Sequence, residues 1–268
     1  MELVNELENA LISLREVKPL VLCLTNNVTM DFVANSLLAL GAAPLMSESV
    51  QELEELVSIS HAVYINIGTL NQAFSERALS VAQLAQLYSK PLVLDPVGAG
   101  ASRLRTDSAK LLVPFTTILR CNASEILALA NEDNKTNGVE ATHLVSQASG
   151  TAKKYAQSLQ KVVAVSGSVD FITDGCEETN LPFGSPLMPL ITGMGCALTG
   201  HMAAFATLKV SSYKAAILAT AYFGLCGQQS SEKTKEPGSF RQFFIDSLYK
   251  PDWKLFKQFE AASQERNS

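Results

Sequence analysis

The stretch PLVLDPVGAGAS, residues 91–102, decides the fold class of this chain. It begins with a short apolar run, reaches an aspartate and then enters a turn of proline, glycine and small residues. A continuous apolar run of this length is typical of a strand buried on both faces of a parallel sheet. Ligands of such sheets bind just outside the carboxyl ends of the strands. The turn that follows Asp95 is therefore a candidate site as well as a strand end.

Four further segments show the same apolar pattern, and helical patterns of crossover length separate them. This alternation predicts an α/β fold with three layers, in which helices cover both faces of a mostly parallel sheet. The expected strands are 19–24, 61–67, 91–96, 116–121 and 161–167. The expected helices are 30–40, 50–58, 74–88, 124–130, 149–159, 195–207, 212–227 and 239–247, with a polar helix after them.

The segment 172–190 departs from this rhythm. It predicts a short antiparallel hairpin with turns at Asp174–Gly175 and Phe183–Gly184, because such dipeptides mark turns. No linker rich in proline or serine interrupts the alternation, and no repeat is visible. We therefore expect one domain over residues 1–268.

Composition and charge exclude several classes of function. The chain has 268 residues, 47% of them hydrophobic, and its net charge of −5 comes without a basic block, so nucleic acid is not an expected partner. The N-terminal segment is acidic and amphipathic, unlike a signal peptide. The longest apolar run, 215–226, is too short for a bilayer and predicts a buried helix, so no membrane partner is expected. Five widely spaced cysteines without a CxxC pair argue against disulfides and zinc, and for a reducing cytoplasm.

Charged side chains follow two neighbouring strands. Asp95 ends one buried strand, where a carboxylate is costly unless it is paired or faces a cation. The next strand ends in RCNASE, which supplies Arg120 and Glu125. Asn122 and Glu125 also have the spacing of an ordinary helix capping box. Together, however, two carboxylates suit Mg²⁺ and the arginine suits a phosphate, so we interpret this edge as a site for both.

The stretch ITGMGCALTG, residues 191–200, places a glycine-rich turn before an apolar helix. Unpaired backbone N–H groups and the helix dipole make such a turn an anion site, usually for phosphate. A thiol at Cys196 is expected to be activated toward thiolate there. The pattern alone leaves three roles open for Cys196, namely nucleophile, base or filler.

Other nucleotide motifs are missing from the sequence. There is no GxxxxGK[ST] segment and no GxSxG segment, and the GMG at 193–195 follows a hairpin rather than the first strand. An anion hole, a pair of carboxylates and an arginine remain. Phosphoryl transfer requires mainly positioning and charge neutralisation, so this set favours a kinase.

Six motifs occur in an order that resembles the hydroxyethylthiazole kinase family, a branch of the ribokinase-like superfamily. They are LTNNVT (24–29), NIGTL (66–70), DPVGAGAS (95–102), RCNASE (120–125), VSGSVD (165–170) and GMGCALTG (193–200). The resemblance covers about residues 15–245. It implies a ribokinase-like αβα sandwich and a homotrimer with active sites between subunits. It also implies phosphorylation of the hydroxyl of 4-methyl-5-(2-hydroxyethyl)thiazole, with ATP as co-substrate and Mg²⁺ as cofactor, in thiamine salvage.

The resemblance also carries roles over to single positions of this sequence. It implies that Met46, Gly195 and Asn26 bind the thiazole. It implies that Arg120 and Ser166 contact ATP, and that Asp95 and Glu125 are associated with Mg²⁺ and phosphates. Cys196 falls where most ribokinase-like kinases carry the aspartate that acts as base. Met194 departs from the family pattern, and it either narrows the substrate mouth or only fills space.

Three alternatives remain beside this reading. A related kinase would act on another heterocyclic alcohol, such as hydroxymethylpyrimidine or pyridoxal. A cysteine-dependent hydrolase or transferase would use Cys196 as nucleophile with a histidine base, and the candidates are His61, His143 and His201. We expect His201 to be structural. A ligand sensor on the same fold would lack catalysis.

Overall fold

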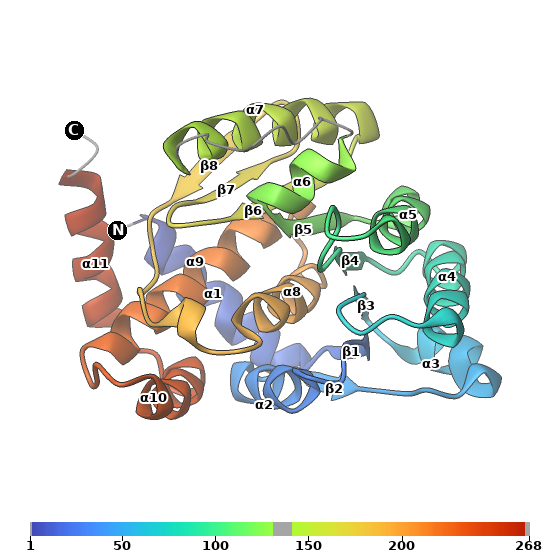
Figure 1. Cartoon of the computed structure of the whole chain (residues 1–268). Coiled ribbons are helices and arrows are strands. Elements are labelled where there is room, and N and C mark those ends of the chain that lie inside the picture. The colour runs from blue at the N-terminus through green and yellow to red at the C-terminus, as the bar shows by residue number, and fades with distance from the viewer. Residues whose placement is uncertain (1, 131–140, 266–268) are drawn as a thin grey trace.

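The computed structural model describes residues 2–130 and 141–265. Within these residues one sheet of eight strands runs in the order β2-β1-β3-β4-β5-β6-β7-β8 (Figure 1). The ladders from β2 to β6 are parallel, and β7 and β8 are antiparallel. The strands are β1 (Leu20–Leu24), β2 (Ala43–Leu45), β3 (Ala62–Asn66), β4 (Leu92–Asp95), β5 (Ile118–Asn122), β6 (Val162–Ser166), β7 (Asp170–Thr173) and β8 (Glu178–Leu181).

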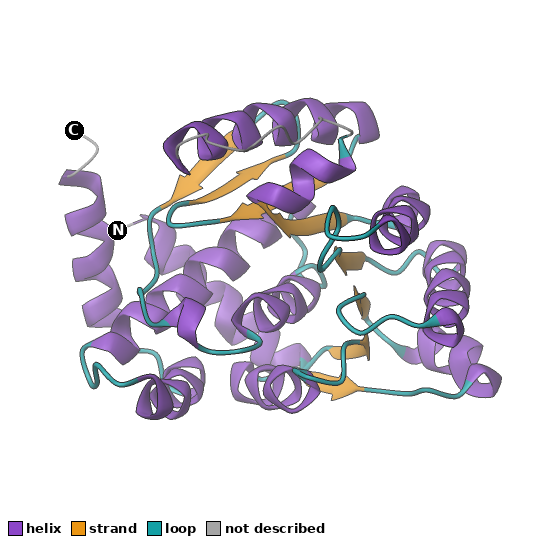
Figure 2. Ribbon diagram, viewed as in Figure 1, coloured by secondary structure: helices purple, strands orange, loops and turns teal. Residues whose placement is uncertain are grey.

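Helices cover both faces of the sheet (Figure 2), which confirms the predicted three-layer arrangement. One layer consists of α1 (Glu2–Val17), α2 (Met30–Leu40), α8 (Met194–Phe205), α9 (Ser212–Ser231), α10 (Pro237–Tyr249) and α11 (Trp253–Glu265). The other consists of α3 (Leu53–Ile59), α4 (Gln72–Leu87), α5 (Arg103–Leu112), α6 (Ala123–Leu129) and α7 (Ala141–Leu159). The short 3₁₀ helices are η1 (Val50–Glu52), η2 (Val113–Phe115) and η3 (Met188–Leu190).

The central strands supply both cores, because successive side chains of a strand point to opposite faces. In β3, Tyr64 enters the core under α8 and α9, whereas Val63 and Ile65 enter the core under α3 to α7. All five residues of β3 are buried, as expected of a strand between two helical layers.

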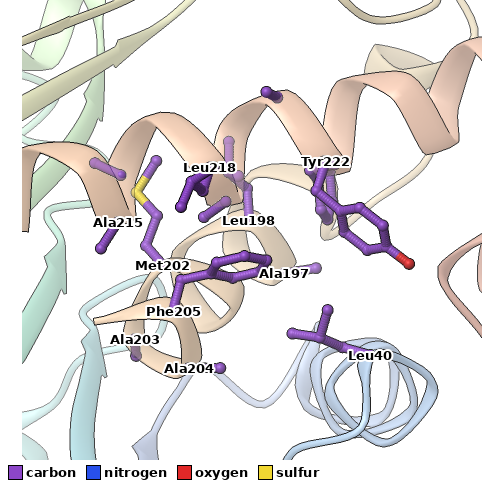
Figure 3. Close-up of a cluster of buried hydrophobic side chains, with 14 of the residues drawn as sticks. Leu40, Ala197, Leu198, Met202, Ala203, Ala204, Phe205, Ala215, Leu218 and Tyr222 are labelled. Atoms are coloured by element: carbon purple, nitrogen blue, oxygen red, sulfur yellow. The ribbon is translucent and has the colours of Figure 1, made fainter. Parts of the chain in front are cut away.

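Helices α8 and α9 are buried on nearly all sides. Met202 and Phe205 of α8 pack beside Leu218 and Tyr222 of α9, and Leu40 of α2 faces the same cluster (Figure 3). A helix that is apolar all round has to be buried, so the interpretation of 215–226 as a buried helix is confirmed. This packing fixes α8, whose first residues reach the carboxyl edge of the sheet. Among the described residues no helix combines the length and apolar character needed to cross a bilayer.

The amphipathic N-terminal segment forms α1, which polar contacts tie to distant helices. Glu260 of α11 accepts hydrogen bonds from the backbone N–H groups of Leu3 and Val4, at 3.2 and 3.4 Å. A carboxylate at this place satisfies free N–H groups of the first turn and suits its positive end. At the other end of α1, Arg15 donates to the carbonyl groups of Leu40 and Tyr249, the last residues of two other helices.

Strand β2 and helix α5 have no counterpart among the predicted strands and helices. Strand β2 has only three residues and contains Pro44, which edge strands tolerate and periodicity does not reveal. Helix α5 lacks a continuous apolar stripe, because it buries Ala109 and Leu112 but exposes Leu104 and Leu111. Its sequence RLRTDSAKLL therefore gives little helical signal.

The predicted hairpin exists, but its extent differs. Strands β7 and β8 form it between residues 170 and 181, around the predicted turn at Asp174–Gly175. In this turn Gly175 has φ +95°, and Asp174 accepts the backbone N–H groups of Cys176 and Glu177. The second predicted turn, Phe183–Gly184, lies beyond the ladder, in the loop that leads to η3. The prediction was too long because that loop has the same turn residues as a hairpin.

Candidate active site

Polar side chains gather where the central strands reach their carboxyl ends. Parallel pairing aligns Asn66 at the end of β3 with Asp95 at the end of β4, and Asn122 of β5 with Ser166 of β6. The first turn of α8 packs over this edge. Of the predicted site residues, the structure brings together Asn26, Asp95, Arg120, Glu125, Ser166, Gly195 and Cys196.

Asp95 is fully buried at the centre of this edge. Its Oδ2 accepts hydrogen bonds from Asn66 and from Thr199 of α8, and it lies 3.5 Å from Nη1 of Arg120. Burial raises the pKa of Asp95 to about 6, although the charge of Arg120 opposes this, and the neighbouring carboxylate of Glu125 raises it further. Its Oδ1 is buried and has no hydrogen-bond partner among the described residues.

Arg120 connects the strand ends with the first turn of α8. Its Nε and Nη2 donate to Oγ of Ser166, at 3.0 and 2.8 Å. A Cβ atom at Gly195 would come within 2.6 Å of Nη1 of Arg120, so only glycine leaves room for the guanidinium. Its side chain is 12% exposed, and it lines an open cleft. Arg120 is thus held in place while keeping access to a ligand.

The turn before α8 has the geometry that its sequence predicts. Gly193 has φ +98°, in the left-handed region that favours glycine, and no side chain of a described residue caps the helix. The N–H of Met194 bonds to the carbonyl of Ile191 at 3.5 Å, whereas those of Gly195 and Cys196, next in the first turn of α8, remain available to an anion. Met194 is 6% exposed and belongs to the core around α8, which agrees with its interpretation as packing.

Cys196 is half-buried in the first turn of α8, and Nδ2 of Asn26 donates to its Sγ at 3.4 Å. Burial and the charge of Asp95 raise the pKa of its thiol. The expected activation toward thiolate was therefore wrong, because desolvation and a nearby carboxylate favour the protonated thiol.

No described histidine is placed to activate Cys196. His61 precedes β3, and its Nδ1 accepts the N–H of Leu20 at the amino end of the sheet. His201 is fully buried in α8 beside Phe223, and burial lowers its pKa to about 3. The side chain of His143 lies outside the described residues. Among those described, a cysteine nucleophile lacks the base that it needs.

Glu125 is both a helix cap and a neighbour of Asp95. Its Oε2 accepts the N–H of Asn122, whose side chain accepts the N–H of Glu125, which completes the capping box. Its Oε1 accepts the N–H of Gly98, in the turn after β4. These bonds hold the carboxylate within reach of the same edge.

The donor set here is compatible with one oxygen-preferring cation. Asp95 offers a buried oxygen without a partner, and the second carboxylate, Glu125, increases the negative charge around it. Mg²⁺ commonly takes one or two carboxylates and fills its remaining positions with water and substrate phosphates. Among the described residues no cluster of three histidine, cysteine or acidic side chains forms a fuller cage.

Two cavities flank this polar centre. The larger one, about 770 Å³, lies between Arg120, Ser166 and Gly195 and the loop 183–191. The smaller one, about 250 Å³, is lined by Met46 after β2, by Thr25 and by Phe74. We call them the large cleft and the small pocket. Met46 therefore lies apart from the residues predicted to contact ATP.

The structure adds three residues that the sequence analysis did not select. Asn66 and Thr199 bind Asp95, and Asp170 lines the large cleft, where burial raises its pKa to about 6. Asn66 could have been found, because it ends a predicted strand within the motif NIGTL. Thr199 gives no such signal, because it lies inside a helix and meets Asp95 only through the packing of α8.

A mostly parallel sheet of this order between two helical layers is the ribokinase-like fold. A solved ribokinase-like superfamily protein from Enterococcus faecalis shares this fold, with a TM-score of 0.64 at 14% identity over 88% of each chain. The family model described as "Hydroxyethylthiazole kinase family" matches residues 11–253. The chain belongs to this family.

Individual relatives agree with this assignment. A hydroxyethylthiazole kinase from Chlamydia abortus is 43% identical over 259 residues, which are 96% of this chain and 99% of the relative. One from Aliivibrio salmonicida is 43% identical over 92% of this chain and 94% of the relative. The solved hydroxyethylthiazole kinase from Pyrococcus horikoshii has a TM-score of 0.87 and 34% identity, covering 94% of this chain and 96% of that one.

Proposed function

We propose that this chain transfers a phosphoryl group from ATP to the hydroxyl of 4-methyl-5-(2-hydroxyethyl)thiazole, as a step of thiamine salvage. Family membership over residues 11–253 supports this assignment. The observation that carries it is the uncapped start of α8 beneath the guanidinium of Arg120. This arrangement concentrates positive charge where a phosphate can meet backbone N–H groups. Phosphoryl transfer depends on such positioning and charge.

The two cavities divide the substrates between them in this proposal. The large cleft takes ATP, with Arg120 and Ser166 on its phosphates. The small pocket takes the thiazole, since its volume of about 250 Å³ and its lining by Met46 and Phe74 suit a small, mostly apolar ring. Gly195 lines the large cleft, and Asn26 is flanked in sequence by Thr25 and Asn27 of the small pocket, so in this proposal the acceptor hydroxyl meets the phosphate near these residues.

Asp95 and Glu125 are the residues that would hold Mg²⁺. When bound, the ion supplies neutralisation of the negative charge on the phosphates. The two carboxylates would hold it at the strand ends. Arg120 compensates the buried negative charge of Asp95.

Cys196 has the position of the base in this proposal. Its raised pKa keeps the thiol protonated, and Asn26 donates to its sulfur, so the S–H proton points elsewhere. In a loose transition state the alcohol loses its proton late, and a strong base adds little. A thiol therefore serves to orient the hydroxyl rather than to attack phosphorus.

Release of ADP tests the proposed function. The purified chain should release ADP with the thiazole alcohol and Mg²⁺, and much more slowly with Mg²⁺ removed or with hydroxymethylpyrimidine or pyridoxal. Cys196→Ser should keep measurable turnover, because the helix start and the metal provide most of the rate. A faster reaction with pyridoxal would favour the alternative kinase, and no ADP release with any alcohol would favour a sensor. A covalent adduct on Cys196 would favour the hydrolase.

Three further properties belong to the same proposal. We expect the chain to form one kinase domain, to assemble as a homotrimer with active sites between subunits, and to function in the cytoplasm. The family resemblance supports the trimer. Light scattering coupled to size-exclusion chromatography should give three times the chain mass of 28.8 kDa, and a monomer would contradict it.

A further inference from the structure

The side chain of Asn66 lies at the centre of the strand ends and uses all of its hydrogen-bonding capacity. It is fully buried. Its Nδ2 donates to Oδ2 of Asp95 and to the hydroxyl of Tyr64, both at 3.0 Å. Its Oδ1 accepts from Nδ2 of Asn26 and from the N–H of Gly68, both at 2.9 Å. An amide has two donor hydrogens and two acceptor sites, so none remains for a substrate.

The partners of Asn66 determine which way its amide faces. An ionised carboxylate can only accept, and a backbone N–H can only donate. The nitrogen of Asn66 therefore faces Asp95, and its oxygen faces Gly68. The same oxygen then requires a donor from Asn26.

Asn26 is oriented in turn by a second fixed donor. Its Oδ1 accepts the backbone N–H of Thr29 at 3.1 Å, so its Nδ2 must point the other way. That nitrogen reaches both Oδ1 of Asn66 and Sγ of Cys196. The chain of bonds thus runs from Asp95 through Asn66 and Asn26 to the thiol.

We propose that Asn66 is a positioning residue, which couples the phosphate side of the site to Cys196 because it holds the amide of Asn26, together with the N–H of Thr29, as a donor to the sulfur. Its catalytic part rests on the proposed kinase function, whereas the coupling to the thiol does not. The burial of both amide side chains makes an unpaired alternative costly, so the orientation is set before substrates bind.

Thiol alkylation tests the coupling without nucleotide or metal. In a Cys176→Ser background the remaining cysteines other than Cys196 are buried, so iodoacetamide modification located by peptide mass spectrometry reports on Cys196. A donor to sulfur stabilises the reactive thiolate. Asn66→Leu should therefore slow alkylation several-fold. A structure that had merely loosened would expose the thiol and speed alkylation.

The variant Asn66→Asp keeps the acceptor oxygen of the side chain and removes its donor nitrogen, so it tests the two ends of the amide separately. Its carboxylate still accepts from Asn26 and Gly68 but places a second acid beside Asp95. Alkylation should slow less than in Asn66→Leu, because the acceptor for Asn26 is kept while the added carboxylate raises the pKa of the thiol, and kcat should fall about 10–100-fold, as is typical when a supporting residue of a site is lost. Asn66→Leu should lower both quantities.

A double variant and a remote control complete the experiment. Asn26→Ala should slow alkylation as much as Asn66→Leu, and the two changes together should add little, since they remove one chain of bonds. Gln229→Leu removes another buried amide, which bonds to Lys250 and Asp252 far from this edge. It should lower the melting temperature and leave alkylation and kcat unchanged. If Asn66→Leu does not fold, the alkylation rates of the single variants Asn26→Ala and Asn66→Asp are compared instead.

Unchanged or faster alkylation in either Asn66→Leu or Asn26→Ala would overturn the coupling. Additive effects in the double variant would also overturn it. If the parent chain has no thiazole kinase activity, the proposed function fails, and the alkylation rates still decide whether Asn66 acts on Cys196.

Discussion

Two helices begin at the same edge of the sheet, and their first turns differ. Helix α6 begins at Asn122, whose side chain accepts the N–H of Glu125, while Glu125 accepts the N–H of Asn122. Helix α8 begins at Gly193, in a left-handed conformation and without a side-chain cap from the described residues. A carboxylate neutralises the positive end of α6. The positive end of α8 instead meets a guanidinium.

The capped start of α6 therefore helps to build the site, whereas the uncapped start of α8 is available to bind the ligand. A capped start has satisfied its N–H groups and compensated its dipole, so it offers an anion little. An uncapped start with an arginine beside it keeps free N–H groups and positive charge that a phosphate can bind. The choice of asparagine or glycine at the first position decides between the two roles.

The largest effect is expected from Gly195→Ala. The new Cβ would press on Nη1 of Arg120, 2.6 Å away, and displace the guanidinium from the helix start. We expect kcat/KM for ATP to fall at least about 100-fold, comparable to the loss of a transition-state donor. Gly238→Ala is the matched control, because nothing lies within 4 Å of its Cβ position at the start of α10. Equal activity of both variants would mean that α8 does not receive the phosphates.

Arg120→Lys should have the next largest effect. Lysine keeps the charge but cannot reproduce the planar fork that binds Ser166 and a phosphate together. The KM for ATP should rise about 10-fold, the cost of a charge-assisted hydrogen bond, and the KM for the thiazole should change little. Arg103→Lys, at an exposed ion pair, should change neither KM. An equal rise in both KM values would indicate a structural role.

The variant Glu125→Gln distinguishes the role of Glu125 in capping α6 from its proposed role in binding Mg²⁺. Glutamine can replace glutamate in a capping box, so α6 should keep its start and its stability. The charge is lost, and we expect kcat to fall about 10-fold or more at limiting Mg²⁺, with partial recovery at high Mg²⁺. Titration of activity against Mg²⁺ measures this. A kcat like that of the parent at limiting Mg²⁺ would leave Glu125 as a cap alone.

Asn122→Ala should have the smallest effect of the four. Loss of an asparagine N-cap costs about 1 kcal/mol, so the free energy of unfolding in urea should fall by that amount. Asn71→Ala removes an equivalent cap, since Oδ1 of Asn71 accepts the N–H of Phe74 at the start of α4. The two losses should agree. No loss at Asn122 would show that Glu125 holds the start of α6 without it.

Local patterns in the sequence were enough for the layers of the fold and for most elements. Five buried strands and the helices between them follow from apolar runs and helical periodicity, and those signals are local. Strand β2 and helix α5 were not predicted, because Pro44 interrupts the strand pattern of β2 and exposed leucines obscure the helical pattern of α5. Their structure depends on contacts with segments that are distant in the sequence, and hydrophobic periodicity does not reveal such contacts.

The candidate site was predictable wherever its residues end strands. Asp95, Arg120 and Ser166 lie at such ends, and parallel pairing had to bring them to one edge. Thr199 could not be predicted, because it depends on how α8 packs across β4. The protonation of Cys196 could not be predicted either, since burial and Asp95 determine it. The catalytic and binding roles of these residues remain predictions.

The bond between α11 and α1 has a consequence for the order in which this chain can fold as it is synthesised. The backbone N–H of Leu3 bonds to Glu260, 257 positions later. A ribosome releases α1 early, but its first turn lacks this cap until α11 has emerged. The buried face of α1, with Leu7 and Leu14, gains α9 first and α11 only afterwards. The layer that supports α8 is therefore completed late, and the apolar face of α1 stays partly uncovered in the nascent chain until α11 has been made.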